Sequence, residues 1–571
     1  MTLCSECKSP LSVVKTRTRT VATLSIGLFT AHETVRRCSN PLCNCSFPAP
    51  GLSALASQQG TYGYDVIVFV GTQLFVACRN EVEIMDCLRE KGIPISRSEI
   101  GVLARKFVVY LSISHQECRP RLRMHTRKRG GYILHLDSTC DADSPHLMSV
   151  LDGISELVLD NIKIPSENAE QIIPFLQRVK RDYGIPLAIV SDMAKGILNA
   201  VATVFPAAPH FICHFHFLRD IGKDLLSDEN DTMRKRLRNH GIQSFLRKHA
   251  LDLKSVVEKD LAGIDALRTR LDNDSSRAFC GENCAALMIY VLTQWALEGK
   301  NNGDGYGFPF DRPYLTFYRR LRSIHDVLDG LRYKCDKAPK HLRRLVGLLW
   351  KHIGDTISDP VLKKAAHRME EKTVVFDRLR QAMRIALPDE RQGLNDDGEK
   401  DMSTIRQRVS RFQQALADTL QTKPDPDYRR MHNQIQLYWE KLFADPIVKK
   451  TPHGPVTIYP QRTNNILERF FRSLRRNHRK RNGTNTMTKT LKAILTDTPL
   501  ISNLSDQAYR SILLNGAPSL ESRFSQIDVQ LVRENLRMEE QEKRDLSPKV
   551  KQLIHSPELM RKILQNASIR Q

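Results

Sequence analysis

The sequence predicts an α/β protein: a mixed sheet with flanking helices, interrupted by a large all-α insertion and preceded by a small cysteine-rich unit. Three observations predict this class. Strand and helix patterns alternate over residues 130–222. Strand patterns then disappear over residues 223–455, where the chain is charged, rich in Leu and Arg and mostly helical in period. The first fifty residues differ from both, because cysteines cluster there.

The composition is typical of a large globular protein that binds a polyanion. The chain has 571 residues, of which 41% are hydrophobic, so several domains with substantial cores can form. Its formal net charge of +23 makes nucleic acid the expected partner. We expect no membrane association, because no apolar run reaches the roughly 18 residues of a spanning helix and no signal peptide opens the chain. The thirteen scattered cysteines favour a reducing compartment and metal binding over disulfides.

Residues 1–50 predict a zinc ribbon. The segments CSEC and RRCSNPLCNC place two cysteine groups on tight turns, and stretches of strand-like composition separate them. Four thiolates give a closed tetrahedral site, and the metal replaces the core that so small a unit lacks. The alternative is a set of ordinary reduced cysteines. The predicted Zn²⁺ ligands are Cys4, Cys7, Cys38 and Cys43, with Cys45 as the alternative fourth ligand.

Residues 60–118 predict a helix-turn-helix domain after a linker over 47–60. The segments that begin at Asn80 and Ser96 each open with a capping-box pattern, and the short turn IPI lies between them. Two capped helices about a short turn suit DNA binding, although any helical hairpin has this pattern.

The segment CRPRLRMHTRKRGG, residues 118–131, carries six Arg or Lys residues and no acid. We expect either a solvated basic loop or a strap that contacts DNA phosphates. The predicted DNA-binding residues of the strap are Arg127, Lys128 and Arg129.

Residues 130–222 predict the mixed sheet. Strand patterns cover GYILHLDST, HLMSVLDGISE, LVLDNIKI, IPLAIVSD and HFICHFHF, and helix patterns cover SENAEQIIPFLQRVKRDYG and KGILNAVATVF. Asp137 and Asp192 each stand at the end of a predicted strand, where neighbouring parallel strands line a crevice. Carboxylates there would suit Mg²⁺ or Mn²⁺. Taken singly, an Asp after a strand is more often a cap or turn residue. The acids that compete for this role are Asp141, Asp143, Asp152 and Asp160.

The stretch TNNILERFFRSLRRNHRKRNG, residues 463–483, holds one acid, Glu468, among seven Arg and Lys residues. It predicts a helix that is capped by one of its first three residues and ends at Gly483. A salt bridge from Glu468 to Arg472 would be worth about 0.2–0.5 kcal/mol and would explain one cation only. A third metal ligand beside a track for DNA phosphates would explain the whole pattern. The cations of this track are Arg469, Arg472, Arg475, Arg476, Arg479, Lys480 and Arg481.

These motifs, in this order, resemble the DDE transposases, whose catalytic core has the RNase H-like fold of retroviral integrases. The Mutator-like transposases are the nearest match, on the strength of LDST, IVSD, the Cys-x-x-His pair in CHFH and the distant helix NNILERFFRSLRR. The resemblance implies an RNase H-like catalytic core over 130–222 and 456–499. It also implies that the all-helical insertion domain, 223–455, divides this core, and that a helical tail follows over 500–571.

The resemblance further implies roles for individual residues. Asp137, Asp192 and Glu468 are similar to the three catalytic carboxylates, which hold two Mg²⁺ or Mn²⁺ ions per active site. Cys213 and His216 match the Cys-x-x-His pair, which we expect to be structural. The implied reaction is metal-dependent cleavage of transposon-end DNA and strand transfer into double-stranded target DNA, by a homodimer or larger synaptic assembly.

Two further classes of function stay open at this point. One is a non-catalytic, domesticated transposase that binds specific DNA, and the other is an RNase H-like nuclease or resolvase. The expected location is the nucleoid in a prokaryotic cytoplasm or the nucleus of a eukaryote. Within the insertion, we expect Trp295 to be a core residue rather than one that stacks on a base. We expect Cys280 and Cys284 to be plain helical cysteines rather than half of a metal site.

Overall fold

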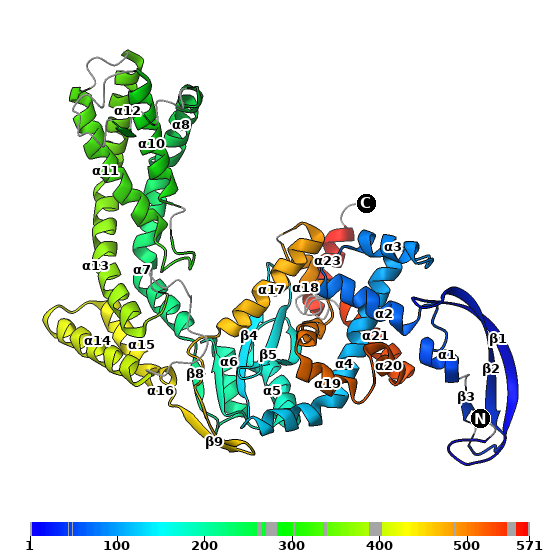
Figure 1. The fold of residues 1–571 in the computed structure, drawn as a ribbon. Coiled ribbons are helices and arrows are strands. Elements are labelled where there is room, and N and C mark those ends of the chain that lie inside the picture. The colour runs from blue at the N-terminus through cyan, green and yellow to red at the C-terminus, as the bar shows by residue number, and fades with distance from the viewer. Residues whose placement is uncertain are drawn as a thin grey trace. The chain divides into compact units, whose positions relative to one another are not determined.

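The computed structural model describes residues 3–43, 45–47, 50–259, 265, 268–269, 282–300, 303–334, 340–386, 402–484, 486–544 and 556–568. Contacts divide the chain into two compact units. The first unit comprises Met1–His210, Ile447–Pro460 and Asn464–Gln571, and the second comprises Phe211–Pro446 and Gln461–Thr463. The chain therefore leaves the first unit after the sheet and returns to it before the helix that carries Glu468 (Figure 1).

The amino-terminal part of the first unit is a three-stranded sheet. Strand β1 (Leu11–Thr23) pairs antiparallel with β2 (Gly27–Cys38), and β2 pairs antiparallel with β3 (Ser46–Phe47). The strand-like stretches predicted between the cysteine groups are thus confirmed. The expected linker that follows is not wholly irregular, because α1 (Pro50–Leu55) lies within it.

Three α-helices and a short π-helix come next: α2 (Tyr64–Gly71), η1 (Thr72–Val76), α3 (Glu81–Glu90) and α4 (Arg97–Lys128). Both predicted caps are present. Asn80 accepts the backbone N–H of Glu83, whose carboxylate accepts the N–H of Asn80 in return, and Ser96 caps α4.

Helix α4 is much longer than the sequence suggested. The prediction of a basic loop over 118–131 was wrong, because α4 continues to Lys128. Cys118, Leu122 and Thr126 recur every four residues and are all buried. Such a row is one face of a helix, so apolar packing outweighs the high charge of the segment. The middle of α4 is buried as well, so α4 is a core element of the first unit.

The predicted mixed sheet is confirmed. Strand order is β6-β5-β4-β7-β8; β4 pairs antiparallel with β5 and parallel with β7, and β5 pairs antiparallel with β6. The elements are β4 (Ile133–Thr139), β5 (His146–Asp152), β6 (Val158–Ile164), α5 (Ala169–Tyr183), β7 (Ala188–Ser191), α6 (Lys195–Val204) and β8 (His210–Ile212). The last predicted strand was too long, because β8 ends at Ile212 and a helix begins at His214.

The carboxyl-terminal part of the first unit closes the core around α4. It contains α17 (Asn465–Asn482), α18 (Thr488–Ala493), the 3-10 helix η2 (Thr498–Ser505), α19 (Gln507–Leu514), α20 (Leu520–Ser525), α21 (Val529–Arg544) and α23 (Pro557–Ser568). Phe524 stacks on Tyr110 of α4 with ring centroids 5.0 Å apart. The segment expected to be a tail is therefore helical, and its first half belongs to the core.

A β-hairpin precedes α17. It consists of β9 (Ile447–Thr451) and β10 (Gly454–Ile458), which pair antiparallel. This hairpin begins inside the range 223–455 that was predicted to be all-helical, so that boundary was wrong. Its β-branched Val, Ile and Thr residues favour strands.

Between 214 and 442, the described residues of the second unit form helices joined by turns and contain no strand. Its helices are α7 (His214–Asn239), α8 (Ile242–Glu258), α10 (Glu282–Glu298), α11 (Pro313–Lys334), α12 (Lys340–Ile357), α13 (Pro360–Met383), α14 (Met402–Thr422), α15 (Pro426–Leu437) and α16 (Trp439–Leu442). Lys372 of α13 and Glu229 of α7 form a buried salt bridge of 2.7 Å between two of them. None of the helices in the described ranges is long and apolar enough to span a membrane.

Two expectations within this unit have different outcomes. Trp295 is not a core residue: it is 40% exposed, and the guanidinium of Arg320 lies 4.6 Å from its ring centroid. Cys280 and the side chain of Cys284 lie outside the described residues, so their roles stay predictions.

Candidate active site and nucleic-acid interface

Asp137 lies on β4, the middle strand of the sheet, and only 9% of its surface is exposed. Burial raises the pKa of its carboxyl well above the ordinary value, and repulsion from Asp192, Glu468 and Glu167 adds to this shift. The backbone N–H of Ser138 opposes the shift by donating to Oδ1 at 2.8 Å. Since such repulsion requires charges that are close in space, these four acids share one neighbourhood.

Asp192 reaches this neighbourhood because of strand register. Strands β4 and β7 run parallel, and Leu136 pairs with Ser191. Asp137 and Asp192 are the next residues in the two parallel segments, so they lie side by side toward the carboxyl ends of the strands. Asp192 Oδ1 also accepts the N–H of Ala194 at 3.1 Å, which is the turn contact expected of an Asp after a strand. A carboxylate has about four acceptor positions, so this contact is compatible with metal binding.

Glu468 is brought to the sheet by Asn464, which lies one helical turn before it and is fully buried. The side-chain amide of Asn464 donates to the carbonyl oxygen of Leu136 at 2.9 Å, and its oxygen accepts from His135 Nδ1 at 2.9 Å. Glu468 follows one helical turn later, and Asp137 follows Leu136 directly. Helix α17 therefore starts on β4 beside Asp137, and its first turn carries Glu468.

Asn464 occupies the cap position that the sequence predicted, but its side chain makes no capping hydrogen bond. It binds the neighbouring strand instead. Further along α17, Arg475 donates to Thr139 Oγ1 at 3.3 Å, so the helix follows β4 past Asp137.

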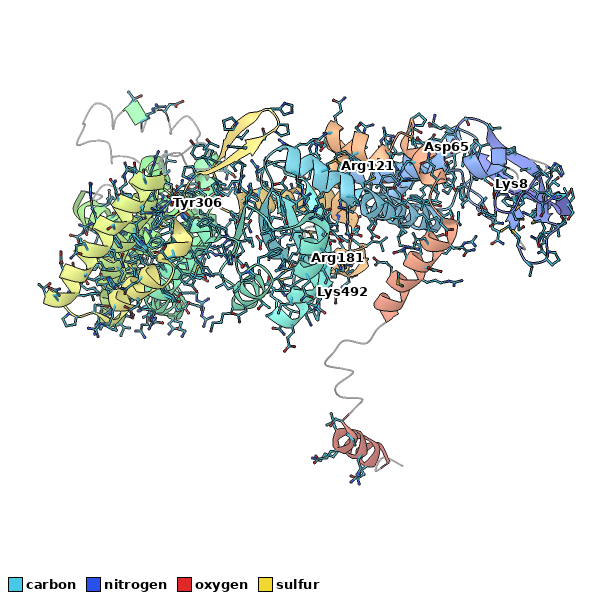
Figure 2. All side chains as sticks on the ribbon, turned by 90° about the horizontal axis from the view of Figure 1, so that it is seen from below. Lys8, Asp65, Arg121, Arg181, Tyr306 and Lys492 are labelled. Atoms are coloured by element: carbon cyan, nitrogen blue, oxygen red, sulfur yellow. The ribbon has the colours of Figure 1, made fainter. Side chains whose placement is uncertain are left out.

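The four competing acids have other partners. Asp141 accepts backbone N–H groups at the start of α18, and Asp143 forms an exposed salt bridge of 2.7 Å with Lys492, which Figure 2 labels. Asp152 bonds the turn after β5, and Asp160 is buried against arginines. Each contact is structural, which separates these four from Asp137.

Sequence reasoning missed Glu167. Its carboxylate accepts a hydrogen bond from Ser138, the residue after Asp137, and lies 3.7 Å from His146 Nδ1. Gly196 allows this arrangement, because a Cβ there would lie 1.8 Å from the carbonyl oxygen of Glu167. No motif marks Glu167, which resembles an ordinary polar residue before a helix.

This group of acids suits a divalent cation. Carboxylate oxygens are the ligands that Mg²⁺ and Mn²⁺ prefer. Asp137 is hard to ionise among its acidic neighbours, and a bound cation would reverse that effect by supplying positive charge at the same place. Asp137, Asp192 and Glu468 therefore have the chemistry to hold metal, with Glu167 beside them.

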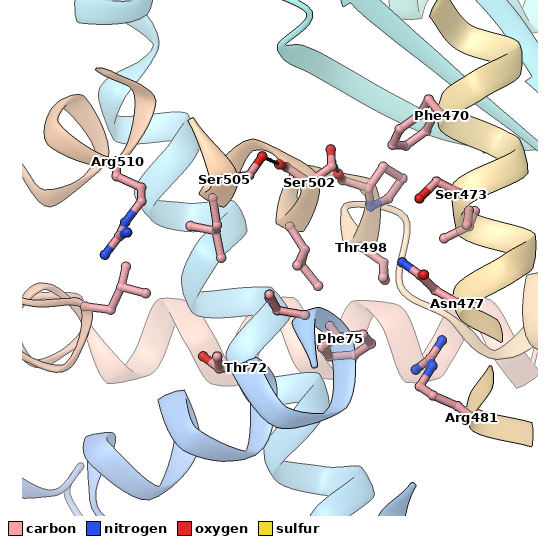
Figure 3. A pocket seen from close by; sticks show the side chains of 16 residues that line it. Thr72, Phe75, Phe470, Ser473, Asn477, Arg481, Thr498, Ser502, Ser505 and Arg510 are labelled. Atoms are coloured by element: carbon pink, nitrogen blue, oxygen red, sulfur yellow. Dashed lines mark hydrogen bonds between the residues drawn. The ribbon is translucent and has the colours of Figure 1, made fainter. Parts of the chain in front are cut away.

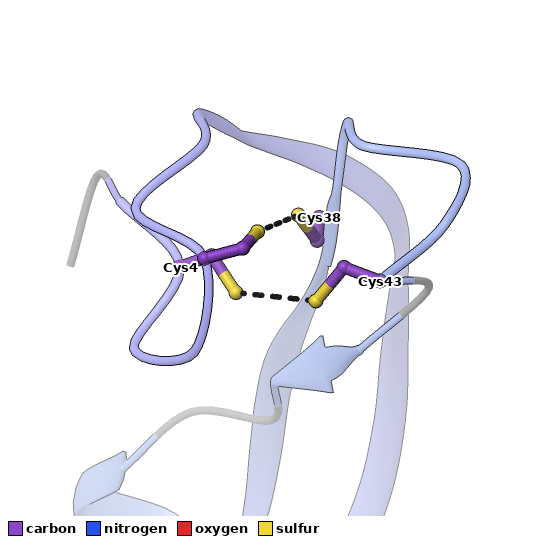
Figure 4. Close-up of side chains that lie close together, drawn as sticks. Cys4, Cys38 and Cys43 are labelled. Atoms are coloured by element: carbon purple, nitrogen blue, oxygen red, sulfur yellow. Dashed lines mark hydrogen bonds between the residues drawn. The ribbon is translucent and has the colours of Figure 1, made fainter.

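The four amino-terminal cysteines lie close together and are compatible with a zinc site (Figure 4). The sulfur atoms of Cys4, Cys7, Cys38 and Cys43 all lie within 4.8 Å of one another, and the Cys4–Cys43 distance is 3.7 Å. Two ligands of a tetrahedral zinc ion with Zn–S bonds of about 2.3 Å are about 3.8 Å apart. Hydrogen bonds to Ser9 lower the pKa of Cys7 to about 6, which favours the thiolate that binds metal. Cys45, the alternative ligand, lies beside the group, with its sulfur 3.3 Å from that of Cys43.

Six of the seven cations predicted for the phosphate track on α17 are exposed, and the seventh is not. The exposed members are Arg469, Arg472, Arg475, Arg476, Arg479 and Lys480. Arg469 forms a salt bridge of 3.0 Å with Glu156. Arg481 departs from the row: it is half-buried, and its guanidinium lies 5.4 Å from the ring centroid of Phe75.

A second basic surface joins the end of α4 to the β9–β10 hairpin. We call it the hairpin surface; it consists of Arg127, Lys128, Arg129, Lys449 and Lys450, all exposed. The two segments meet at Gly130, where an added Cβ would lie 3.3 Å from Lys449 Cβ. Among the described residues, no acid forms a salt bridge with any of these five cations. Arg121, exposed on the same helix, continues the charge along α4 (Figure 2).

Cys213 and His216 lie in the second unit, at the start of α7, and both are buried. Burial, followed by the charges of Arg219 and Lys223, lowers the pKa of His216 to about 3. The imidazole is therefore neutral at physiological pH. A structural role for this pair stays a prediction.

Comparison with known proteins does not name a family for this chain. No family model matches it, and no curated protein matches it.

Proposed function

We propose that the protein is a DDE transposase that cleaves transposon-end DNA and transfers the cut strand into target DNA. One observation carries the proposal: strand register places Asp192 beside Asp137, and the hydrogen bonds of Asn464 to β4 bring the first turn of α17, with Glu468, to the same place. Burying like charges together is unfavourable unless a ligand uses them, and perturbed acids of this kind are typical of active sites.

In the proposed mechanism the three acids hold the metal and the arginines hold the DNA. Bound Mg²⁺ or Mn²⁺ would supply Lewis acidity to the attacking and departing oxygens of an in-line phosphoryl transfer. Arg475, tied to β4 beside the acids, and the exposed cations of α17 would position backbone phosphates without reading bases. The hairpin surface would bind phosphates further along the duplex.

The finer assignments belong to the same proposal. We assign the mixed sheet to an RNase H-like core, which is supported by an acid on its middle strand and another directly after the parallel neighbour. We assign α3 and α4 to a helix-turn-helix, supported by their two caps. In this assignment the first turn of α4 would enter the DNA groove, because the middle of α4 is buried and its far end belongs to the hairpin surface. The cysteine group would hold Zn²⁺ and help to recognise transposon ends.

Synapsis of two ends calls for a homodimer or larger assembly, and the substrate calls for a nucleoid or nuclear location. A non-catalytic DNA-binding protein is the second candidate, because the cysteine group and the basic surfaces do not depend on the acids. An RNase H-like nuclease or resolvase would share the acids but would join no strands.

The test compares cleavage of a duplex that carries an inverted repeat flanking the coding region, in the presence of Mg²⁺. We expect Asp137→Asn to lose cleavage by about 10²-fold or more, because metal-bound transition states lose several kcal/mol. Asp143→Asn, which removes an exposed acid of the loop after β4, should cut like the wild type. Equal cutting by wild type and Asp137→Asn would remove Asp137 from the mechanism.

Two further assays separate the candidates. Joined product from a pre-cut end favours a transposase over a nuclease. Specific binding without any metal-dependent nicking favours the non-catalytic DNA-binding protein.

A further inference from the structure

A cavity of about 470 Å³ lies in the first unit between α17, η1 and η2 (Figure 3). One wall is a single face of α17, formed by Phe470, Ser473, Asn477 and Arg481. At about 100° per residue these positions lie roughly 140–220° around the helix from Glu468. The cavity is therefore on the opposite face of α17 from the acids, and it is a separate site.

Arg481 gives the cavity its charge. Its Nε atom is buried and makes no hydrogen bond within the part of the chain that the structure describes. Burial lowers the pKa of Arg481, and the nearby Cys78 and Glu81 oppose this shift. Glu81 is itself paired with Arg97. A partly desolvated cation of this kind is costly without an anion close by.

The geometry of Arg481 specifies the type of anion. The guanidinium of Arg481 lies over the ring of Phe75. Its Nε is buried, but its two Nη atoms form no hydrogen bond with a described residue and remain for other partners. A pair of N–H donors of this kind matches the paired oxygens of phosphate. Arg510 is exposed at another side of the same cavity (Figure 3).

The remaining wall suits a flat aromatic body. The rings of Phe75 and Phe470 line it, together with Leu474, Pro499 and Ile501. The amide of Asn477 forms no hydrogen bond with a described residue and has both donors and an acceptor to offer. Small-molecule sites typically measure about 300–1,000 Å³ and combine an apolar lining with a few polar groups, as this one does.

We propose that this cavity binds a single nucleotide, with the phosphate on Arg481 and the base between the aromatic wall and Asn477. The nucleotide is either a free mononucleotide or an unpaired nucleotide of a DNA strand. The proposal does not rest on the acids or on transposase activity.

The first experiment measures equilibrium binding of the four 5′-deoxynucleoside monophosphates to the full-length protein. Deoxynucleosides and inorganic phosphate serve as partial ligands. At least one monophosphate should bind ten-fold or more tightly than its nucleoside and than phosphate. Arg481→Gln removes the cation, and Ser473→Trp fills the cavity while keeping the cation. Each should weaken binding ten-fold or more, whereas Arg181→Gln, an exposed arginine on α5, should not.

The second experiment uses a DNA duplex with one unpaired nucleotide and the fully paired duplex. If the nucleotide belongs to DNA, the wild type prefers the unpaired form and both cavity variants lose this preference. If the ligand is a free mononucleotide, the cavity variants lose affinity for mononucleotides, and the wild type binds the two duplexes equally. The proposal is overturned if the wild type binds no mononucleotide and shows no preference for the unpaired form. It is also overturned if both cavity variants behave like wild type. Since Asp137-dependent cleavage is assayed separately, failure here leaves the transposase proposal standing.

Discussion

Asp137 is a carboxyl group whose ionisation is opposed by its surroundings. Burial and three neighbouring acids raise its pKa in the folded protein above the value in the unfolded chain, about 3.9. The folded state therefore binds the proton more tightly than the unfolded state does. The resulting stabilisation is fully present below pH 3.9 and is lost as the pH rises through the folded-state pKa.

A prediction follows for metal-free stability. With zinc retained and no magnesium added, Asp137→Asn should be more stable than wild type at pH 8, by about 0.5–2 kcal/mol, the usual size of a stabilising substitution. The advantage should shrink as the pH falls, because the wild-type carboxyl then takes up its proton. Thermal unfolding between pH 5 and 8 measures this.

Magnesium provides the matching control for that series. It should raise the Tm of wild type and leave that of Asp137→Asn nearly unchanged. A variant that is less stable than wild type throughout, with the same response to magnesium, would show that Asp137 has a structural role.

A second prediction at this scale concerns Asn464. Replacement by alanine removes the hydrogen bonds that Asn464 makes with His135 and with the carbonyl oxygen of Leu136. A hydrogen bond contributes about 0.5–1.5 kcal/mol, so Asn464→Ala should lower the free energy of unfolding by about 1–3 kcal/mol. Urea unfolding measures the change. Asn477→Ala on the same helix should stay within about 0.5 kcal/mol of wild type. Equal small effects of both would mean that Asn464 does not anchor α17.

At the scale of elements, the hairpin surface has a measurable signature. Each phosphate contact contributes a slope of about −0.9 to log K against log salt on duplex DNA. If Lys449 and Lys450 each contact a phosphate, the double substitution to glutamine should reduce the slope by about 1.8, equally for specific and non-specific duplexes.

The matched control for this measurement is Lys363→Gln with Lys364→Gln, two adjacent exposed lysines on α13. That pair should leave the slope near the wild-type value. If both double variants change it equally, the protein binds DNA through its overall charge, and the hairpin surface has no special part.

The local elements were predictable where their signals are local. The caps at Asn80 and Ser96 and the five strands of the sheet follow from patterns within about a dozen residues. The length of α4 was not predictable. Cys118, Leu122 and Thr126 are recognisable as a buried face only when their packing partners are known. The same holds for Asn464, whose contacts with β4 join residues more than three hundred positions apart.

At the scale of the whole molecule, we expect the amino-terminal sheet with its four cysteines to fold independently of the rest of the first unit. Cys4→Ser should lose one zinc per chain and unfold residues 3–47, because this small sheet has little other core. Limited proteolysis and metal analysis measure both effects. Specific DNA binding should fall, while the rest of the chain keeps its resistance to protease. The Cys45→Ser variant should keep its zinc, whereas Cys43→Ser should lose it. If Cys45→Ser loses its zinc and Cys43→Ser keeps it, Cys45 is the fourth ligand in place of Cys43.

Asp137, Asp192 and Glu468 could be singled out from the order of their motifs along the chain. Glu167 and the cavity at Arg481 could not. Glu167 depends on how closely Gly196 lets two segments approach. Arg481 looks like one more cation of its helix, and only the burial of its Nε distinguishes it.

The excursion of the chain through the second unit has a consequence for synthesis. On the ribosome, Asp137 and Asp192 emerge early, but Glu468 is made only after the helices that intervene. A nascent or prematurely terminated polypeptide would hold two of the three acids and no means to cut. In the proposed chemistry, translation itself delays nuclease competence until α17 has been made, which protects the host chromosome from fragments.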